Sequence, residues 1–312
     1  MDSRLLDSLR RILRGETTVG RLLRHETTFK IGGPARILVV PAGCEDLQRL
    51  FRWARDWGVP LEVLGGGSNL LALDEGFPGI VLRLGPAFSG MKRKEESLVS
   101  VGAAEPLARL VIRAHQWGLS GLEGLTGIPG TVGGSLVMNA GTRMGALGDL
   151  VVSARVMDSR GKVSSMSARQ MDLGYRRSRF QRRRGLVLGM ILRLRPDDRG
   201  RIRLRMMRAL AERRSRQPLG WPSAGSVFVN PPEAAAGLLI DRAGARGLRY
   251  GGAQISALHA NFIINRGGAR AGDVIWLMRR ARYLVWRRHG VALRPEIRLL
   301  GGEWDGFLPD LP

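Results

Sequence analysis

The sequence has few of the side chains that build disulfides and metal sites. Among its 312 residues there is one cysteine, Cys44, which excludes an internal disulfide. Its four histidines, His25, His115, His259 and His289, lie far apart without the spacing of metal ligands, so we expect no metal centre. No apolar run approaches the roughly 20 residues of a transmembrane helix, so we expect no membrane span.

Residues 1–15 contain neither an apolar core nor a small-residue cleavage site, so we expect no secretion signal in this segment. The apolar residues of this segment fall on one helical face, namely Leu5, Leu6, Leu9, Ile12 and Leu13. Such a face packs either on the protein or on a membrane surface, and we expect the first. These absences predict a cytoplasmic protein.

Lysine is also scarce. Only four of the 50 basic residues are lysines, which leaves 46 arginines against 27 acidic residues and a formal net charge of +23. Nucleic-acid-binding proteins concentrate charge on one face among aromatic residues. Here the arginines are spread along the chain and are densest in residues 176–184 and 199–216. We therefore expect weak binding of nucleic acid at low salt and no specific nucleic-acid partner. The arginine bias is typical of a GC-rich genome, and it would also attract polyanionic substrates.

The length suits two or three domains, and the hydrophobic fraction of 44% suits a packed core. Helical and strand patterns alternate, which predicts an α+β fold. Strands are expected at residues 35–41, 61–64, 80–84, 97–103, 151–158, 161–165, 186–194, 255–256, 262–264 and 296–300. Helices are expected at residues 44–57, 106–118, 199–217, 234–243 and 273–290. The last strand is expected to return to the first part of the chain.

Residues 121–141 contain seven glycines and no charge after Glu123. Glycine at this density lets the backbone adopt positive φ and approach a ligand, and the amides of such turns suit a phosphate. The alternative is a packed run of turns without a ligand.

A second glycine cluster, residues 65–69 (GGGSN), follows the expected strand at 61–64. A strand that leads into a glycine turn is a common way to present amides to a phosphate. No helix is expected after it and no Lys-Ser/Thr pair follows, so it is neither a dinucleotide fingerprint nor a P-loop.

Six motifs occur in one order along the chain: GGGSN at 65–69, GIPGTVGGSLVMNAG at 127–141, YRRSRF at 175–180, AGSVFVNP at 224–231, SALHANFIIN at 256–265 and RPEIRLLG at 294–301. From about Arg24 to Gly301 the chain therefore resembles the UDP-N-acetylenolpyruvoylglucosamine reductases. The resemblance implies a two-part FAD-binding region of the PCMH/vanillyl-alcohol-oxidase type and a C-terminal α+β substrate domain. The implied parts are residues 1–84 with 297–312, residues 85–198, and residues 205–296.

The resemblance also implies a reaction. NADPH reduces a non-covalently bound FAD, and hydride then passes to the enolpyruvyl ether of a UDP-sugar, giving UDP-N-acetylmuramate after protonation. This step belongs to peptidoglycan precursor synthesis, and so to cell-wall biogenesis, cell shape and the division cycle. The site must orient the flavin, stabilise an enolate and supply one proton. We expect a monomer.

Three residues match the family's catalytic positions. Ser226 matches the proton donor, although a serine in this context is otherwise a turn residue. Arg176 matches the arginine that grips the substrate carboxylate, although composition alone makes it one surface arginine among many. Glu296 matches the catalytic glutamate, with pairing to Arg294 or Arg298 as the alternative.

The resemblance assigns the flavin contacts to both glycine segments and the last strand. They are Gly65, Gly66, Gly67, Ser68, Asn69, Leu70, Thr126, Gly127, Ile128, Pro129, Gly130, Thr131, Gly133, Gly134, Asn139, Ala140, Gly141 and Arg298. It assigns the substrate contacts to Tyr175, Asn230, His259 and Asn261, of which His259 is equally well explained as a structural histidine.

The chain departs from the family pattern at three places. Val229 stands where the family usually has a lysine, so another base, such as an arginine, must replace it. Residues 142–146 (TRMGA) replace the usual AYGGE. A substrate-clamping tyrosine loop is absent, since the only tyrosines are Tyr175, Tyr250 and Tyr283. These features indicate the shorter branch of the family.

Two other functions stay open at this point. One is a related FAD-dependent oxidoreductase with a different substrate. The other is a flavin- or nucleic-acid-binding protein without catalysis. Replacing Ser226 with alanine separates them, because only a reductase would lose turnover.

Overall fold

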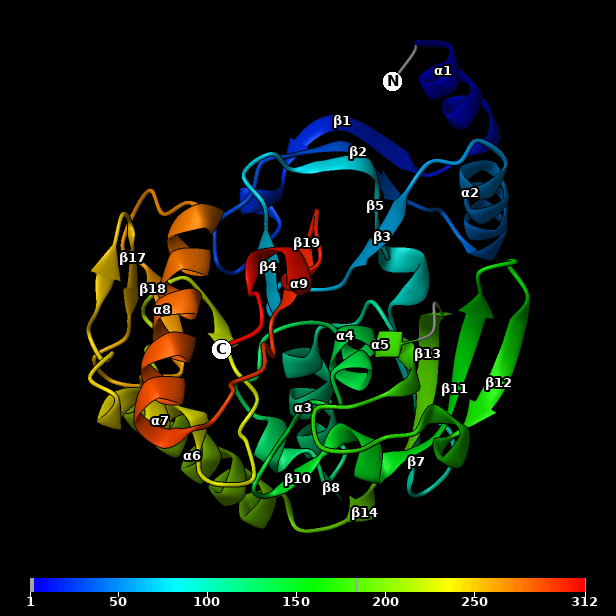
Figure 1. Cartoon of the computed structure of the whole chain (residues 1–312). Coiled ribbons are helices and arrows are strands. Elements are labelled where there is room, and N and C mark those ends of the chain that lie inside the picture. The colour runs from blue at the N-terminus through cyan, green and yellow to red at the C-terminus, as the bar shows by residue number, and fades with distance from the viewer. Residues whose placement is uncertain (1–2, 183–184, 312) are drawn as a thin grey trace. The chain divides into compact units, whose positions relative to one another are not determined.

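The hairpin expected across Ser159 and Arg160 is present in the computed structural model, which describes residues 3–182 and 185–311. It belongs to an antiparallel five-stranded sheet of order β12-β11-β13-β7-β6 (Figure 1). The strands are β6 (Met91–Arg93), β7 (Leu98–Gly102), β11 (Val151–Asp158), β12 (Val163–Ser167) and β13 (Gly185–Arg193). Arg183 and Arg184, at the end of the basic stretch 176–184, lie outside the described residues.

The sequence pattern predicted that this strand starts at Gly161. In the structure, strand β12 begins two residues later, at Val163. Gly161 has a φ of 82° and belongs to the turn. The Asp158 carboxylate accepts hydrogen bonds from the backbone N–H groups of Arg160 and Lys162, both at 2.9 Å. These bonds stabilise a turn that extends to Lys162, two residues further than the apolar pattern indicates.

The chain divides into two units. The first contains Met1–Thr18, Ile37–Gly66 and Ile80–Arg213, and the second contains Val19–Arg36, Gly67–Gly79 and Arg214–Pro312. A further sheet has the order β1-β2-β5-β3. Its strands are β1 (Glu16–Leu22), β2 (Pro34–Val40), β3 (Leu61–Leu64) and β5 (Phe77–Arg83).

Helices α3 (Leu107–Gln116) and α4 (Val132–Val137) pack with the five-stranded sheet in the main core of the first unit. The apolar face expected for α3 is buried, as Leu107 and Leu110 show with no exposed area. Helix α4 lies inside the glycine-rich segment, where the sequence analysis expected no helix. The burial of its Val132 and Leu136 stabilises it in spite of its glycines.

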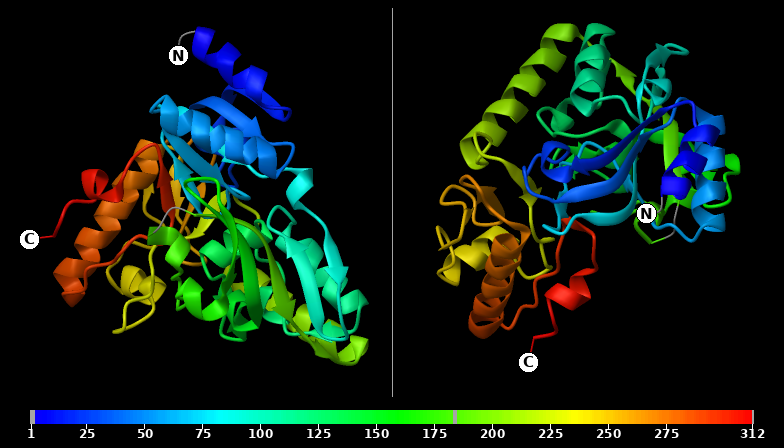
Figure 2. Two further views of the ribbon diagram at one scale, coloured as in Figure 1. Left: turned by 90° about the vertical axis from the view of Figure 1, so that its right-hand side faces the viewer. Right: turned by 90° about the horizontal axis from the view of Figure 1, so that it is seen from above.

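Helix α1 (Ser3–Ile12) lies beside α2 (Cys44–Asp56) in both views of Figure 2. Leu9 of α1 is fully buried, and the Trp53 indole N–H of α2 donates to the Ser8 hydroxyl at 2.9 Å. The expectation that the N-terminal helix packs on the protein is confirmed.

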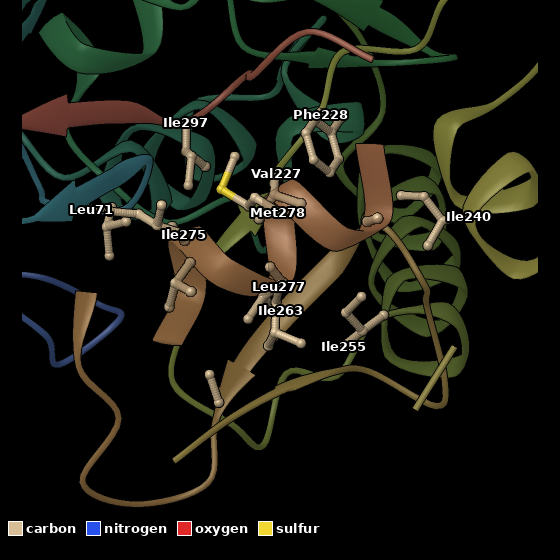
Figure 3. Packing of buried hydrophobic residues seen from close by; sticks show 14 of the residues in the cluster. Leu71, Val227, Phe228, Ile240, Ile255, Ile263, Ile275, Leu277, Met278 and Ile297 are labelled. Carbon is tan, nitrogen blue, oxygen red and sulfur yellow. The ribbon is translucent and has the colours of Figure 1, made fainter. Parts of the chain in front are cut away.

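The second unit has a four-stranded antiparallel sheet of order β15-β18-β17-β16. The strands are β15 (Ser223–Ser226), β16 (Arg249–Tyr250), β17 (Ala253–Ile255) and β18 (Phe262–Asn265). Helices α7 (Ala236–Arg242) and α8 (Ala271–His289) pack with this sheet, and Figure 3 shows their apolar core with Met278, Ile263 and Phe228. The strand expected at 255–256 is displaced to 253–255.

The C-terminal strand β19 (Arg298–Leu300) pairs in parallel with β4 (Leu70–Ala72). It begins two residues later than expected, at Arg298, because the preceding residues pair elsewhere. The Glu296 N–H donates to the Val227 carbonyl at 2.9 Å, and Pro295 bridges to Phe228.

Helix α6 is present as expected, and only Ile202 among its residues is fully buried. The remaining elements are β8 (Leu119–Ser120), β9 (Gly141–Thr142), β10 (Gly145–Ala146), α5 (Arg179–Arg182), β14 (Arg195–Pro196), α6 (Arg199–Arg216) and α9 (Trp304–Phe307). Among residues 3–182 and 185–311, none of the helices has the length and apolar character needed to cross a membrane.

Candidate active site

The two glycine segments of the sequence meet in the first unit. Strand β3 leads into Gly65 and Gly66, as expected. A Cβ atom on Gly66 would lie 2.5 Å from the Cα of Gly130, and one on Gly65 would lie 3.2 Å from the Thr131 Oγ1. Only glycine at position 66 permits this approach. The chain continues from the turn into strand β4, so no helix follows, as expected.

The second segment turns sharply before it enters α4. Gly127 and Gly130 have φ values of 77° and 115°, in the region that favours glycine. Thr131 caps α4, because its Oγ1 accepts a hydrogen bond from the Gly134 N–H at 3.2 Å. Gly133 serves packing, since a Cβ there would lie 2.8 Å from the Ala103 Cβ. The packing explanation of the glycine content therefore holds at Gly133, whereas ligand binding by Gly127 and Gly130 stays a prediction.

This donor set fits the diphosphate of a dinucleotide cofactor. Residues 126–134 contain no carboxylate, and their polar groups are backbone amides and two threonine hydroxyls. Closely approaching glycines leave the backbone accessible, and amides of such turns bind phosphate. The residues present thus suit the group that the sequence motifs predict.

Asn139 holds the next part of the site in place. It is buried and has a positive φ of 43°. Its amide donates to the Gly174 carbonyl at 2.8 Å, and its Oδ1 accepts from the Gly148 N–H at 2.9 Å. Both groups of the side chain thereby fix the loop that leads to Tyr175.

Arg176 lies in a constrained turn after this loop. Its φ of 51° is rare for a side chain of this size, and its carbonyl accepts a hydrogen bond from the Gln181 amide at 3.2 Å. Its guanidinium lies 5.7 Å from the ring centroid of Tyr175, whose side chain is exposed. The turn thus presents a cation and an aromatic ring together.

Arg213 of α6 is a candidate that the sequence analysis missed. Burial lowers the pKa of its guanidinium, and the charge of Arg176 lowers it further. A Cβ on Gly127 would lie 3.2 Å from the Arg213 Cδ, so this arginine packs on the glycine segment. Two mutually repelling cations beside a phosphate-type loop favour an anionic ligand. No local signal distinguishes Arg213 from the other arginines of α6.

Several predicted residues of the second unit lie on adjacent segments. Ser226 ends β15 after Gly225, whose φ is 79°, and the pairing of β15 with β18 is irregular there. The next residue, Val227, accepts the hydrogen bond from the Glu296 N–H. The Asn69 amide donates to the Glu296 carbonyl at 3.1 Å. The fold therefore brings Ser226, Glu296 and Asn69 into one neighbourhood.

Asn261 supports this neighbourhood from the other side. It is buried, its Oδ1 accepts from the Phe228 N–H at 3.0 Å, and its amide donates to the Phe228 carbonyl at 2.8 Å. These bonds fix the backbone two residues after Ser226. Asn230 accepts from the Ala236 N–H at 2.9 Å, just where α7 begins.

His259 is held as a neutral ring. Its Nδ1 accepts from the Asn261 N–H at 3.3 Å, and its ring meets Phe262 edge-on with 4.9 Å between centroids. Burial lowers the pKa of His259, and the charge of Arg246 lowers it further. These contacts agree with the structural explanation of this histidine.

Each predicted site residue thus belongs to a defined local group within one unit. The first unit holds Gly65, Gly66, Thr126–Gly134, Asn139–Gly141, Tyr175 and Arg176. The second unit holds Gly67–Leu70, Ser226, Asn230, His259, Asn261, Glu296 and Arg298. No group of three or more His, Cys, Asp or Glu side chains suited to a metal ion occurs among the described residues.

Comparisons with known proteins agree with the order of the motifs. A family model of the UDP-N-acetylenolpyruvoylglucosamine reductase C-terminal domain matches residues 217–300, and a model of an FAD binding domain matches residues 35–167. The reductase of this name from Heliobacterium modesticaldum is 42% identical over 96% of this chain and 97% of its own length. The one from Moorella thermoacetica is 46% identical, with coverage of 90% and 91%.

The crystal structure of the UDP-N-acetylenolpyruvylglucosamine reductase from Thermus caldophilus is also similar. It has 39% sequence identity and a TM-score of 0.79, and the match covers 92% of this chain and 99% of that one.

Proposed function

Because the chain belongs to the UDP-N-acetylenolpyruvoylglucosamine reductase family, we propose that it reduces UDP-N-acetylglucosamine enolpyruvate to UDP-N-acetylmuramate. It is an FAD-dependent oxidoreductase with the expected α+β fold, whose FAD-binding region is of the PCMH type. The observation that carries the substrate proposal is the 42% identity over 96% of the chain to a reductase of this name. Cytoplasmic location and the monomeric state stay predictions.

We further propose NADPH as the hydride donor and a non-covalent FAD. When bound, FAD supplies a two-electron carrier between the nicotinamide and the substrate. The first glycine segment, Gly65–Leu70, and the second, Thr126–Gly134, would hold its diphosphate, with Asn139–Gly141 and Arg298 as further contacts. The close approach of Gly66 and Gly130 supports this assignment. So does the absence of Cys and His from both segments, which leaves no side chain for a covalent link.

The proposed parts of the chain follow from the same comparison. Residues 1–84 with 297–312, and residues 85–198, would hold FAD, and residues 205–296 would hold substrate. The FAD-domain match at 35–167 and the C-terminal match at 217–300 support this division.

Three side chains carry the proposed chemistry on the substrate. The Ser226 hydroxyl donates the proton to the α-carbon, and its place after a glycine with positive φ supports this role. Arg176 grips the carboxylate on which negative charge develops, which suits its fixed, strained turn. Glu296 hydrogen-bonds within this group, and its backbone contact with Val227, next to Ser226, supports a shared site.

Substrate contacts are proposed for Tyr175, Asn230, His259 and Asn261. Arg213 is added to them as a second cation near Arg176.

Arg294 is the best replacement for the lysine that Val229 displaces. The Val229 N–H donates to the Arg294 carbonyl at 3.0 Å, so the two residues are direct neighbours on adjacent segments. The Arg294 side chain is exposed and has the charge that an anionic substrate requires.

The proposal is tested by anaerobic mixing of the FAD-loaded protein with NADPH, followed by addition of the enolpyruvyl substrate. We expect Ser226→Ala to keep flavin bleaching by NADPH and to lose turnover by at least about 100-fold, because general acid catalysis contributes that much. Ser223→Ala, at the other end of β15, is the matched control and should turn over normally.

Two results would contradict the proposal. Bleaching without turnover in the unaltered protein would identify an FAD-dependent oxidoreductase with another substrate. Full turnover in Ser226→Ala would show that Ser226 is not the proton donor.

A further inference from the structure

The second unit contains a pocket of about 830 Å³ whose described lining includes none of the residues assigned above. This volume is in the range of small-molecule sites. Its walls come from the chain between β1 and β2, from the second residue after β4, from the approach to β15 and from the loop before α8. The lining residues used below are Arg24, Lys30, Asp74, Trp221, Asn265, Arg266, Gly267, Gly268 and Arg270.

The charge of the lining is strongly positive. Arg24, Lys30, Arg266 and Arg270 contribute four positive charges against the single carboxylate of Asp74, which gives a formal charge of +3. The Asp74 carboxylate accepts hydrogen bonds from the first N–H groups of α8, at 3.0 Å and 3.4 Å. Its charge is therefore engaged with the helix start, and the pocket favours an anion.

Arg266 is held in a defined position. Its guanidinium lies over the Trp221 ring, 4.3 Å from the centroid, and its backbone N–H donates to the Gly252 carbonyl at 2.9 Å. A guanidinium that stacks on an indole keeps its N–H edge available for an oxyanion. The cation is thus placed before any ligand arrives.

Asn265 fastens two walls of the pocket to each other. It is buried, its Oδ1 accepts from the Gly267 N–H at 2.9 Å, and its amide donates to the Phe29 carbonyl at 3.1 Å. The loop that carries Arg266 is therefore tied to the segment that carries Lys30. Such preorganisation lowers the cost of binding.

The backbone around these cations also suits an anion. Lys30 has a positive φ of 55°, a conformation that long side chains rarely adopt and that is enriched at ligand sites. Gly267 and Gly268 have φ values of 123° and 65°, and a Cβ on either would meet nothing within 4 Å. This part of the wall is therefore bare backbone beside open space, so no side chain at these two positions obstructs a ligand that approaches Arg266.

We propose that this pocket binds a diphosphate group, either as inorganic pyrophosphate or within a nucleotide, as a site additional to the reductase site. A formal charge of +3 matches a small polyanion better than a single carboxylate. Guanidinium groups bind phosphoryl oxygens through paired hydrogen bonds. The volume also accommodates a nucleoside. This inference does not depend on the proposed reductase function.

The test is calorimetric titration of the FAD-loaded full chain with inorganic pyrophosphate and, separately, with ADP at 150 mM salt. We expect pyrophosphate affinity to fall at least tenfold in Arg266→Gln and in Lys30→Met. Arg249→Gln removes one exposed positive charge of the same unit outside this lining and should leave the affinity unchanged. Tighter binding of ADP than of pyrophosphate would identify a nucleotide as the ligand, and equal or weaker binding would identify the inorganic ion.

Three outcomes would overturn the proposal. The first is the absence of binding of both probes to the unaltered protein. The second is an equal loss of affinity in Arg249→Gln, which would indicate diffuse attraction by net charge. The third is a parallel change in the KM or kcat of the reductase reaction in both pocket variants, which would make the pocket part of the reductase site. Flavin content and circular dichroism establish that each variant is folded. Arg266→Gln and Lys30→Met remove different side chains of the pocket, so both should lose pyrophosphate affinity.

Discussion

Single residues with unusual backbone conformations define the candidate site. Asn139 and Arg176 both have positive φ, and each stands where a loop must be fixed against a neighbouring segment. Gly66 is the tightest position, because the Gly130 backbone occupies the space where its side chain would be. Substitutions at such positions are expected to affect flavin binding and stability together.

Gly66→Ala tests this close approach. We expect the free energy of unfolding to fall by about 1–3 kcal/mol, because the added Cβ meets backbone that cannot rotate away. The flavin content of the purified protein should fall with it. Gly272→Ala is the control, since a Cβ there meets nothing within 4 Å on helix α8. Equal flavin content and equal urea midpoints in the two variants would refute the argument.

The buried ring of His259 should make the free energy of unfolding depend on pH. Burial lowers its pKa below the ordinary value of 6.5, so the unfolded chain binds a proton at a higher pH than the folded protein does. The stability contributed by the neutral ring is therefore present above pH 6.5 and is lost as the pH falls toward the lower pKa of the folded protein.

The variant His259→Gln should flatten the dependence of unfolding free energy on pH between about 5 and 7. The exposed and non-titratable neighbour Leu258 gives the control variant Leu258→Gln, which should keep the slope of the unaltered protein. An unchanged slope in His259→Gln would show that this histidine does not titrate differently on folding.

At the scale of elements, an ionic group around Arg205 connects α6 to the segment Ser120–Glu123 of the same unit. The Arg205 guanidinium donates to Glu123 at 2.8 Å, to Asp197 at 2.5 Å and to the Ser120 hydroxyl at 3.2 Å. Burial alone would raise the pKa of Glu123, but the hydrogen bonds from Arg205, the backbone and Ser120 outweigh it and lower that pKa. This contribution is present above the ordinary pKa of 4.5 and is lost as the pH falls through the lower folded value.

Arg205→Met should lower the unfolding free energy by about 2–3 kcal/mol at pH 7, because it leaves the buried Glu123 carboxylate without its cation. Arg203→Met removes an exposed arginine of the same helix and should change stability by less than about 0.5 kcal/mol. Chemical denaturation of both variants measures the difference. Similar values for the two would mean that the ionic group is not a significant tie.

At the scale of the whole molecule, the net charge of +23 is the dominant property. NADPH and a UDP-sugar are polyanions, so long-range attraction should raise their rates of encounter. We expect kcat/KM for NADPH to fall several-fold between about 50 and 500 mM salt, because screening shortens the range of attraction, while kcat stays nearly constant. Steady-state assays across this range measure both constants. A kcat/KM that is independent of salt would show that the arginines do not steer substrate.

Local patterns predicted much of this protein. The spacing of Leu107 and Leu110 predicted α3, and the glycine turn after β3 was expected from five consecutive residues. The order of six short motifs was sufficient to predict the family. These features are local, and therefore a linear pattern contains them.

Other features depend on partners that no local pattern specifies. Helix α4 was missed because its glycines disfavour helix, whereas burial of Val132 and Leu136 stabilises it. Arg213 was missed because only its packing against Gly127 distinguishes it from other arginines. The last strand is shorter than its apolar pattern because Glu296 pairs with Val227 instead.

The sequence by itself thus determined the α+β class, the two glycine segments and the motifs that carry the candidate residues. Only the tertiary structure decided which of these meet. Asn69 and Glu296 are 227 positions apart, yet the side-chain amide of one donates to the backbone carbonyl of the other. Such pairs are chosen by the packing of the whole core, because each backbone group that leaves water must find a partner wherever the fold places one.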